Sequence, residues 1–401
     1  MARSVAECDG ASPIAPEVVI DNELRRDLRG LIDRICSDFP DAYWRDLDET
    51  RSYPDEFVAA LTGTGCLGAL VPEEYGGLGL GLGDATVLLE GINANGGNAG
   101  AVHAQMYTMG SVLRHGSEEQ KRRYLPGIAS GGIRLQAFGV TEPTAGTDTT
   151  SISTTATRTA DGYVLNGQKV FISRVQHSDL MLLLARTTPR DEVARKSGGM
   201  SMFIVDLRET KGIDVRPLRT MMNHETNEVF FTDAHIPADA LLGEEGKGFR
   251  YVLDGMNAER ILIAAECIGD GRWFVERASR YASERRVFGR PIGQNQGVQF
   301  PIARAHVHVE AADLMRWKAA DLFDAGAPCG AEANMAKMLA ADASWEAAEA
   351  ALQTHGGYGF AAEYDIERKF RETRLYQVAP ISTNLVLSFV GEHVLGMPRS
   401  F

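Results

Sequence analysis

The spacing of apolar positions changes twice along the 401-residue chain. Over residues 21–130 apolar side chains recur three and four positions apart, which is the period of a helix with one buried face. The predicted helices cover residues 21–39, with Asp21 as the cap, 53–61, 84–92 and 117–128. The first third of the chain is therefore expected to be a helical domain, residues 1–132.

From Ile133 the pattern becomes alternating and rich in β-branched residues, which is typical of strands. The predicted strands cover residues 134–141, 151–156, 163–173, 180–186, 201–205 and 228–236. Asp161-Gly162 separates two of these runs and indicates a hairpin, because glycine tolerates the positive φ that the turn requires. We expect a middle β domain over residues 133–246.

After residue 246 long helical periods return, and they are rich in alanine. The predicted helices cover residues 251–284, 298–325 and 332–354. Helices of this length are typical of a bundle, here residues 247–401. The predicted fold class is α+β, and the lack of alternating βαβ units argues against a Rossmann fold.

Composition narrows the classes of partner and compartment. A net charge of −13 argues against broad binding to nucleic acid or anionic membranes, because a phosphate surface needs clustered positive charge. No apolar run reaches the ~20 residues needed to insert into a membrane. The first twenty residues lack a signal-peptide pattern, so we expect a cytoplasmic protein.

The five cysteines lie far apart and form no CxxC or Cys/His cluster. This spacing fits buried free thiols better than disulfides or zinc ligands, and we expect no metal site.

A glycine-rich run, residues 71–83, has the composition of a nucleotide-binding loop. It lacks the GxGxxG register and no predicted strand precedes it. We therefore interpret it as a turn between helices.

Two predicted strand ends carry glycine and hydroxyl residues: Ala-Phe-Gly-Val-Thr-Glu-Pro-Thr-Ala-Gly-Thr-Asp at 137–148 and Lys-Val-Phe-Ile-Ser at 169–173. They resemble the signature and the flavin-facing segment of the acyl-CoA dehydrogenase family. The likeness continues through residues 281–290, 294–296 and 353–357 and spans the chain from residue 71 to Leu395. Each motif alone could be an ordinary strand end or turn, but five in this order favour the family.

The resemblance implies an N-terminal helical domain, a β-barrel-like middle domain and a C-terminal four-helix bundle that together bind FAD. Short polar groups at strand ends suit the flavin ring, while guanidinium groups and open glycine backbone suit its pyrophosphate. The implied FAD-binding residues are Phe138, Val140, Thr141, Gly146, Thr147, Phe171, Ile172, Ser173, Arg285, Phe288, Gln296, Gln353, Gly356, Gly357, Ser382 and Asn384. In the family the segments around Arg285 and Gly356 reach the FAD of a neighbouring subunit, which implies a homo-oligomer, typically a tetramer.

The expected reaction needs a carboxylate that removes the proton α to a thioester carbonyl. Pro380 lies where many members place this glutamate, and Ile381 takes the place of the glycine after it. A minority of the family carries the glutamate on the helix that opens the bundle, and Glu259 falls at that position. Apolar neighbours on the same helical face would raise its pKa. The alternatives are a structural ion pair at Glu259, or Glu266 as a weaker candidate base.

Pro380 has no N–H to donate to the thioester oxygen. Either the Ile381 N–H or the Ser382 hydroxyl replaces that donor, or the substrate binds in a different pose. The resemblance assigns the remaining substrate contacts to Thr147, Asn257, Arg260 and Ile381, although Arg260 could equally pair with an acidic group.

The resemblance thus implies an oxidoreductase of fatty or branched acyl metabolism that converts an acyl-CoA to a trans-2-enoyl-CoA. An electron-transferring flavoprotein would be the electron acceptor. Two alternatives stay open: an oxidase or flavoenzyme with altered chemistry, and a paralogue that binds acyl-CoA or flavin without turnover. Chain length cannot be assigned, because Met106 and Met109 match a family helix near the acyl tail but are typical of core filling.

Overall fold

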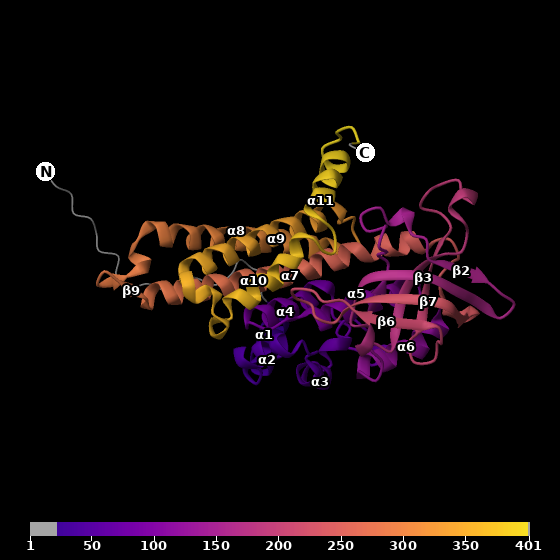
Figure 1. Cartoon of the computed structure of the whole chain (residues 1–401), viewed down its shortest axis with the longest axis horizontal. Helices are drawn as coiled ribbons and strands as arrows, with labels where there is room; N and C mark the ends of the chain where they lie inside the picture. Colours follow the sequence, from indigo (N-terminus) through magenta and orange to yellow (C-terminus); the bar gives the residue numbers. More distant parts are fainter. Residues whose placement is uncertain (1–21, 400–401) are drawn as a thin grey trace.

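The computed structural model describes residues 22–399 and has the predicted order of helices, sheet and helices (Figure 1). The predicted cap Asp21 lies outside these residues, and Asn22 caps the first helix by accepting the Arg25 N–H at 2.9 Å. Cys8 is also outside them, and the four cysteines that are described are buried free thiols.

From residue 22 onward, the N-terminal part contains six α-helices: α1 (Glu23–Ser37), α2 (Asp41–Thr50), α3 (Asp55–Gly63), α4 (Leu82–Ala94), α5 (Gly100–His115) and α6 (Glu118–Ser130). Helices α2 and α5 were not predicted individually. Helix α2 buries only Trp44, whereas α5 is buried on nearly every side, so neither has a clear apolar stripe. Residues 71–83 form a turn with a short 3₁₀ helix before α4, as expected.

One eight-stranded sheet forms the middle part, with strand order β6-β7-β3-β2-β4-β5-β8 and β1 paired in parallel with β4. Its strands are β1 (Leu135–Gly139), β2 (Thr155–Arg158), β3 (Gly162–Ser173), β4 (Leu180–Arg186), β5 (Met200–Asp206), β6 (Ile213–Pro217), β7 (Thr226–Pro237) and β8 (Leu241–Leu242). The hairpin predicted at residues 161–162 joins β2 and β3, where Arg158 faces Tyr163.

The start of the strand predicted over residues 151–156 is wrong. Asp148 accepts the Thr150 N–H at 3.1 Å and caps a 3₁₀ turn over Thr149–Ser151, so β2 begins only at Thr155. Strand β6 was missed because its residues are only partly buried at the edge of the sheet.

Five helices form the C-terminal part: α7 (Gly248–Glu284), α8 (Gln296–Asp324), α9 (Gly330–His355), α10 (Ile366–Arg374) and α11 (Thr383–Phe389). Helix α7 extends from beside the sheet to the short β9–β10 hairpin (Arg286–Val287 and Arg290–Pro291) at the opposite end of the molecule (Figure 1). No helix of the described residues is long and apolar enough to cross a membrane.

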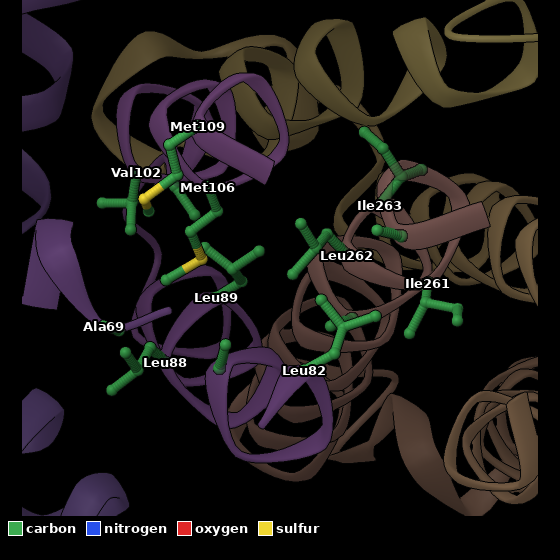
Figure 2. Packing of buried hydrophobic residues seen from close by; sticks show 14 of the residues in the cluster. Ala69, Leu82, Leu88, Leu89, Val102, Met106, Met109, Ile261, Leu262 and Ile263 are labelled. Carbon is green, nitrogen blue, oxygen red and sulfur yellow. The ribbon is translucent and has the colours of Figure 1, made fainter. Parts of the chain in front are cut away.

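The main core lies where α4, α5 and α7 meet (Figure 2). Met106 and Met109 of α5 are completely buried there, beside Leu89 of α4 and Leu262 of α7. The two methionines are thus core residues, as interpreted from the sequence.

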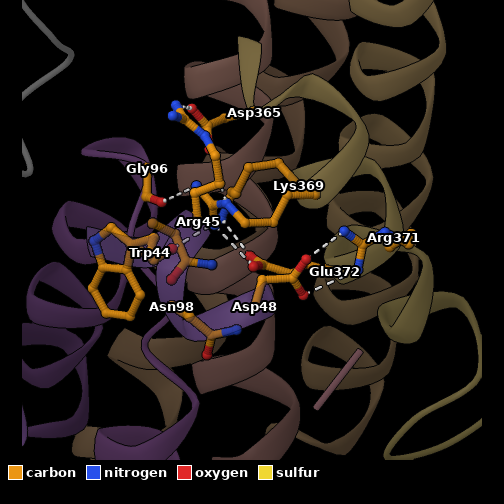
Figure 3. Close-up of polar contacts among 12 residues, drawn as sticks. Trp44, Arg45, Asp48, Gly96, Asn98, Asp365, Lys369, Arg371 and Glu372 are labelled. Carbon is orange, nitrogen blue, oxygen red and sulfur yellow. Dashed lines mark hydrogen bonds and ion pairs between the residues drawn. The ribbon is translucent and has the colours of Figure 1, made fainter. Parts of the chain in front are cut away.

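Polar contacts join the N-terminal helices to α10 (Figure 3). Arg371 Nη2 of α10 donates to Asp48 Oδ2 of α2 at 2.6 Å, and His224 before β7 contacts the same carboxylate at 2.8 Å. The Lys369 ammonium donates to the Gly97 carbonyl at 2.9 Å. These contacts connect all three parts of the chain.

Candidate active site

The end of β1 is fixed by a buried ion pair. Lys169 Nζ of β3 lies 2.8 Å from Glu142 Oε1 and donates to the Val140 carbonyl at 3.0 Å. The Val170 N–H donates to the Thr141 carbonyl at 2.9 Å. Val140 and Thr141, both predicted to face a flavin, are therefore held by β3 in one position.

Electrostatics favour the charged form of this glutamate. Burial alone would raise the pKa of Glu142, but Lys169 and hydrogen bonds from Ser153 and Thr154 outweigh burial and bring it to about 2. Glu142 and Lys169 lie inside the two sequence motifs, yet their pairing was not predicted. The only signal in the sequence was that the two motifs carry side chains of opposite charge.

Phe171 lies beside this position in an unusual conformation. Its φ is 58°, and the pairing of β3 with β7 shifts register between Lys169 and Ile172. The side chain is 65% exposed. Positive φ costs a non-glycine residue free energy, and the exposed ring does not offset this cost by packing within the chain. Strained residues of this kind cluster at binding and active sites.

Ser173 ends β3 next to this bulge. Its hydroxyl accepts a hydrogen bond from the Asn223 amide at 2.8 Å, which leaves the hydroxyl proton free for a ligand. Phe138 of β1 lies edge-on to Tyr107 of α5, with 5.7 Å between ring centroids. Helix α5 therefore packs against β1 next to the predicted flavin contacts.

Glu259 lies on the α7 face directed at α5. It is 8% exposed, and no side chain among the described residues donates a hydrogen bond to it or forms an ion pair with it. Burial raises the pKa of Glu259, His103 and Arg260 oppose the rise, and Glu266 adds to it. Glu259 also raises the pKa of the buried Tyr107 hydroxyl, which places the carboxylate near the ring that contacts Phe138.

Glu266, the alternative base, is already engaged. Its Oε2 accepts the Tyr376 hydroxyl at 3.0 Å, and its Oε1 lies 2.8 Å from His103 Nδ1. Neither His103 nor Tyr376 was assigned a role from the sequence, although both lie in stretches that resemble segments of the family.

The neighbouring polar residues of α7 lie near the start of α9, since a Cβ added to Gly330 would be 3.9 Å from Asn257 Nδ2. Arg260 Nη1 donates to Asn257 Oδ1 at 3.1 Å, and Arg260 Nε is buried with no hydrogen-bond partner among the described residues. Burial lowers the pKa of Arg260 and Glu259 opposes this change. An under-satisfied guanidinium next to the candidate base is suited to bind an anionic or carbonyl group of a ligand.

The segment around Pro380 approaches this region from the end of the chain. The buried Lys337 of α9 donates to the Ile381 carbonyl at 2.7 Å. Among residues 22–399 no group accepts a hydrogen bond from the Ile381 N–H, so this N–H is available. Ser382 caps α11 by accepting the Leu385 N–H at 3.4 Å, so its hydroxyl proton is also available. The Ile381 N–H and the Ser382 hydroxyl, the two groups considered as replacements for the missing Pro380 N–H, can thus each donate a hydrogen bond. Asn384 is exposed on α11.

The predicted phosphate contacts lie at the other end of α7. Arg285, Gly357 and Tyr358 line a cleft of ≈490 Å³, and the Arg285 guanidinium lies 5.7 Å from the centre of the Tyr358 ring. Gly356 has a φ of +58°, and a Cβ added to Gly356 or Gly357 would meet no atom within 4 Å, so this backbone is open to a ligand. Gln296, Gln353 and the fully exposed Phe288 surround this end of the molecule.

The structure therefore divides the predicted site in two. Residues 259 and 285 lie at positions along α7 that are roughly 39 Å apart at about 1.5 Å of rise per residue. One FAD cannot touch both ends within a single chain. The predicted residues Phe138, Val140, Thr141, Phe171, Ile172 and Ser173 belong to the Glu259 end, with the exposed Gly146 and Thr147 in the turn after β1.

The comparisons identify the family. The chain matches the N-terminal domain of acyl-CoA dehydrogenases over residues 22–132, the middle domain over 137–234 and the C-terminal domain over 246–395. It is 36% identical over 387 residues to an acyl-CoA dehydrogenase of Mycobacterium tuberculosis, covering 95% of this chain and 98% of the relative. An acyl-CoA dehydrogenase of Bacillus subtilis is 35% identical over 355 residues, covering 87% and 92%.

Solved structures agree. A glutaryl-coenzyme A dehydrogenase in complex with glutaryl-CoA has a TM-score of 0.88 at 30% identity, covering 96% of this chain and 98% of that one. Butyryl-CoA dehydrogenase from Megasphaera elsdenii has a TM-score of 0.89 at 28% identity, covering 94% and 100%.

The chain belongs to the acyl-CoA dehydrogenase family. It is an oxidoreductase that acts on a CH–CH group, its cofactor is FAD, and the predicted fold is confirmed. The residues present fit that cofactor: the half-buried strand ends and the exposed Phe171 suit a flat ring, and Arg285 with the open Gly356–Gly357 backbone suits a diphosphate.

Proposed function

We propose that this protein is an acyl-CoA dehydrogenase that removes the α-proton and β-hydride of an acyl-CoA thioester to give a trans-2-enoyl-CoA, with Glu259 as the base. The observation that carries the proposal is the buried Glu259 carboxylate, which has no ion-pair partner within residues 22–399 and lies near the strand ends that suit a flavin. Bound FAD supplies the hydride acceptor. Burial raises the pKa of Glu259 and makes its carboxylate a stronger proton acceptor.

The remaining residues position the substrate. Arg260 and Asn257 lie beside the base and suit the CoA portion, and Thr147 lies in the exposed turn after β1. The Ile381 N–H or the Ser382 hydroxyl donates to the thioester oxygen in place of the donor that Pro380 lacks. One oxyanion donor typically contributes about 10²–10³ in rate, so one of these two groups is needed.

The division of the site supports an oligomer in which each FAD lies between two chains. One chain contributes the Glu259 end, and a second contributes Arg285, Phe288, Gln296, Gln353, Gly356 and Gly357. A stripe on α8 (Phe300, Val307 and Leu314) is 54–61% exposed, and its seven-residue spacing places the three side chains on one face. We propose a homotetramer and an electron-transferring flavoprotein as the acceptor of the electrons.

The test is anaerobic loss of flavin absorbance on adding acyl-CoA thioesters of different chain lengths. Glu259→Gln is expected to retain FAD and lose bleaching with every thioester. Glu276→Gln, an exposed position on the same helix, is the matched control and should bleach normally. Undiminished bleaching by Glu259→Gln would refute the assignment, and loss in Glu266→Gln alone would transfer the role to Glu266.

A second measurement separates dehydrogenase from oxidase. The protein with acyl-CoA under air and without another acceptor is expected to release little hydrogen peroxide. Stoichiometric peroxide would support the oxidase alternative, and acyl-CoA binding without flavin reduction would support the non-catalytic one.

A further inference from the structure

A buried lysine holds the segment that follows Pro380. Lys337 of α9 is 0% exposed, and its ammonium group donates to the Ile381 carbonyl at 2.7 Å. In the part of the chain that the structure describes, this ammonium group forms no ion pair and no second hydrogen bond. Fully buried lysines are normally paired with a carboxylate, because an unpaired buried charge is costly. Lys337 is thus held by a backbone carbonyl of the candidate active site instead of by a carboxylate.

The ionisable groups around Lys337 do not neutralise it. Burial lowers the pKa of Lys337, Cys267 of α7 and Asp342 of α9 oppose this change, and Arg260 adds to it. Burial raises the pKa of the Cys267 thiol well above its usual value, so the thiol is neutral near pH 7. Asp342 is exposed and accepts the Gln377 amide at 3.0 Å. Two cationic side chains, Lys337 and Arg260, therefore lie in this region, and neither has an ion-pair partner within residues 22–399.

Three buried polar atoms near the same segment also lack a partner. Asn334 lies three residues before Lys337, on the same side of α9, and Thr383 lies two residues after Ile381. Asn334 Oδ1, Thr383 Oγ1 and Arg260 Nε are buried with no hydrogen-bond partner among the described residues. Asn334 is only 1% exposed, so solvent does not satisfy its oxygen. Since native structures rarely leave such atoms unsatisfied, a polar ligand fits beside this segment.

The peptide group that Lys337 holds lies between the two candidate donors to the thioester oxygen. Its carbonyl belongs to Ile381, whose own N–H is one candidate, and its nitrogen belongs to Ser382, whose hydroxyl is the other. We propose that Lys337 is a positioning residue that fixes this peptide group and thereby directs the neighbouring donor at the thioester oxygen of the substrate. The inference rests on the proposed function, in which an acyl-CoA binds beside Glu259. A hydrogen bond from a charged donor is about twice as strong as a neutral one, which suits it to hold a backbone segment in place.

The position of this donor affects removal of the α-proton. When the Cα–H bond breaks, the proton passes to Glu259 and the electron pair spreads onto the thioester oxygen. A donor placed where this negative charge develops stabilises it, and a displaced donor stabilises it less. Loss of Lys337 should therefore make the α-proton harder to remove while the base stays in place.

The test uses the FAD-loaded protein and a 3-thiaacyl-CoA, in which sulfur replaces the β-methylene group. Its α-proton can be removed but no β-hydride can follow, so the bound anion persists and absorbs at long wavelength beside the oxidised flavin. The pH dependence of this absorption gives the apparent pKa of the bound analogue. Lys337→Met and Lys337→Gln should each raise that pKa by about one unit or more, a tenfold fall in the anion below the midpoint. Lys318→Met, at an exposed position of α8, is the control with an unmoved pKa.

A second measurement reports the donor directly. The analogue carries ¹³C at its thioester carbonyl, and infrared spectra of the neutral bound form give the carbonyl stretch, which rises when a hydrogen-bond donor is lost. We expect the stretch and the pKa to rise together in both Lys337 variants. An unmoved pKa overturns the inference even if the protein is less stable, because Lys337 then has only a structural role. A raised pKa with an unmoved stretch also overturns it, because the charge alone then acts. If Lys337→Met does not bind FAD, Lys337→Gln decides by the same two criteria.

Failure of this inference is distinct from failure of the proposed function. Glu259→Gln should abolish the anion, and an anion that still forms would refute Glu259 as the base. The carbonyl stretch of the neutral analogue does not depend on the base, so it tests Lys337 in either case. If Glu259→Gln abolishes the anion while both Lys337 variants behave as the wild type does, only the role of Lys337 is refuted.

Discussion

Replacing Lys169 by methionine tests how the end of β1 is held. The substitution keeps most of the apolar stem but removes the ammonium group that lies 2.8 Å from Glu142 Oε1. Both side chains are almost completely buried, with exposed fractions of 0% and 2%. Glu142 would then be a buried charge without its ion-pair partner.

The magnitude follows from what remains around Glu142. Breaking a buried ion pair by removing one partner costs about 3–5 kcal/mol. Three donors stay in place: the Ser153 N–H at 2.6 Å, the Ser153 hydroxyl at 2.8 Å and the Thr154 N–H at 2.9 Å. We therefore expect the lower end of that range, about 3 kcal/mol less free energy of unfolding.

The dependence on pH gives the sharper prediction. In the wild type the pKa of Glu142 is depressed to about 2, so its contribution is present above its unfolded pKa and is lost only as pH falls toward 2. In Lys169→Met burial is no longer opposed by the ammonium, and the pKa of Glu142 rises. Protonation then relieves the unpaired charge, so the loss in stability shrinks between pH 7.5 and pH 5.5.

The assay is urea unfolding of the flavin-free protein at both pH values, with the Glu142→Gln/Lys169→Met double variant as the matched control. The double variant should recover most of the stability, because it removes both charges. A loss below about 1 kcal/mol, or one that is equal at both pH values, would show that the ion pair does not hold this strand end.

Three further predictions follow from the other contacts. Arg285→Ala should weaken FAD retention about tenfold or more, because hydrogen bonds to charged groups contribute about 1.5–3 kcal/mol. The control Arg280→Ala, on the solvent side of α7, should retain FAD as the wild type does. Equal FAD retention by both variants in equilibrium dialysis would argue against a phosphate contact at Arg285. Phe171→Ala should change the stability of the flavin-free protein by less than about 0.5 kcal/mol but weaken flavin binding, as measured by titration; a large loss of stability would mean that the ring packs within the chain. Val307→Asp should lower the mass measured by light scattering and FAD occupancy together, and an unchanged mass would exclude the α8 stripe from the subunit interface.

The sequence predicted those elements whose burial follows a simple period. Strand β4 was predicted over its full observed range, Leu180–Arg186, because every residue is buried and the run is apolar. Helix α5 was not predicted individually, since burial on nearly all sides removes the 3.6-residue contrast that marks a helix. Local patterns cannot predict which face of α5 meets α7. The contact of His103 with Glu266 depends on that packing.

The two ends of α7 account for the division of the sequence motifs. The residues proposed for flavin and proton transfer lie in or just after β1 and β3 and in the first half of α7. Arg285 and Gly356 lie at the far end of the bundle. Helix α7 can bring both the proposed base and Arg285 to a flavin only if its far end reaches the flavin of another chain. Pro380 adds no carboxylate to the near end, where Glu259 is buried and has no ion-pair partner in the part of the chain that the structure describes. With Glu259 as the proposed base and Arg285 as a proposed contact to a second subunit, catalysis and the proposed subunit contact would share one helix, so a shift of α7 along its axis would affect both together.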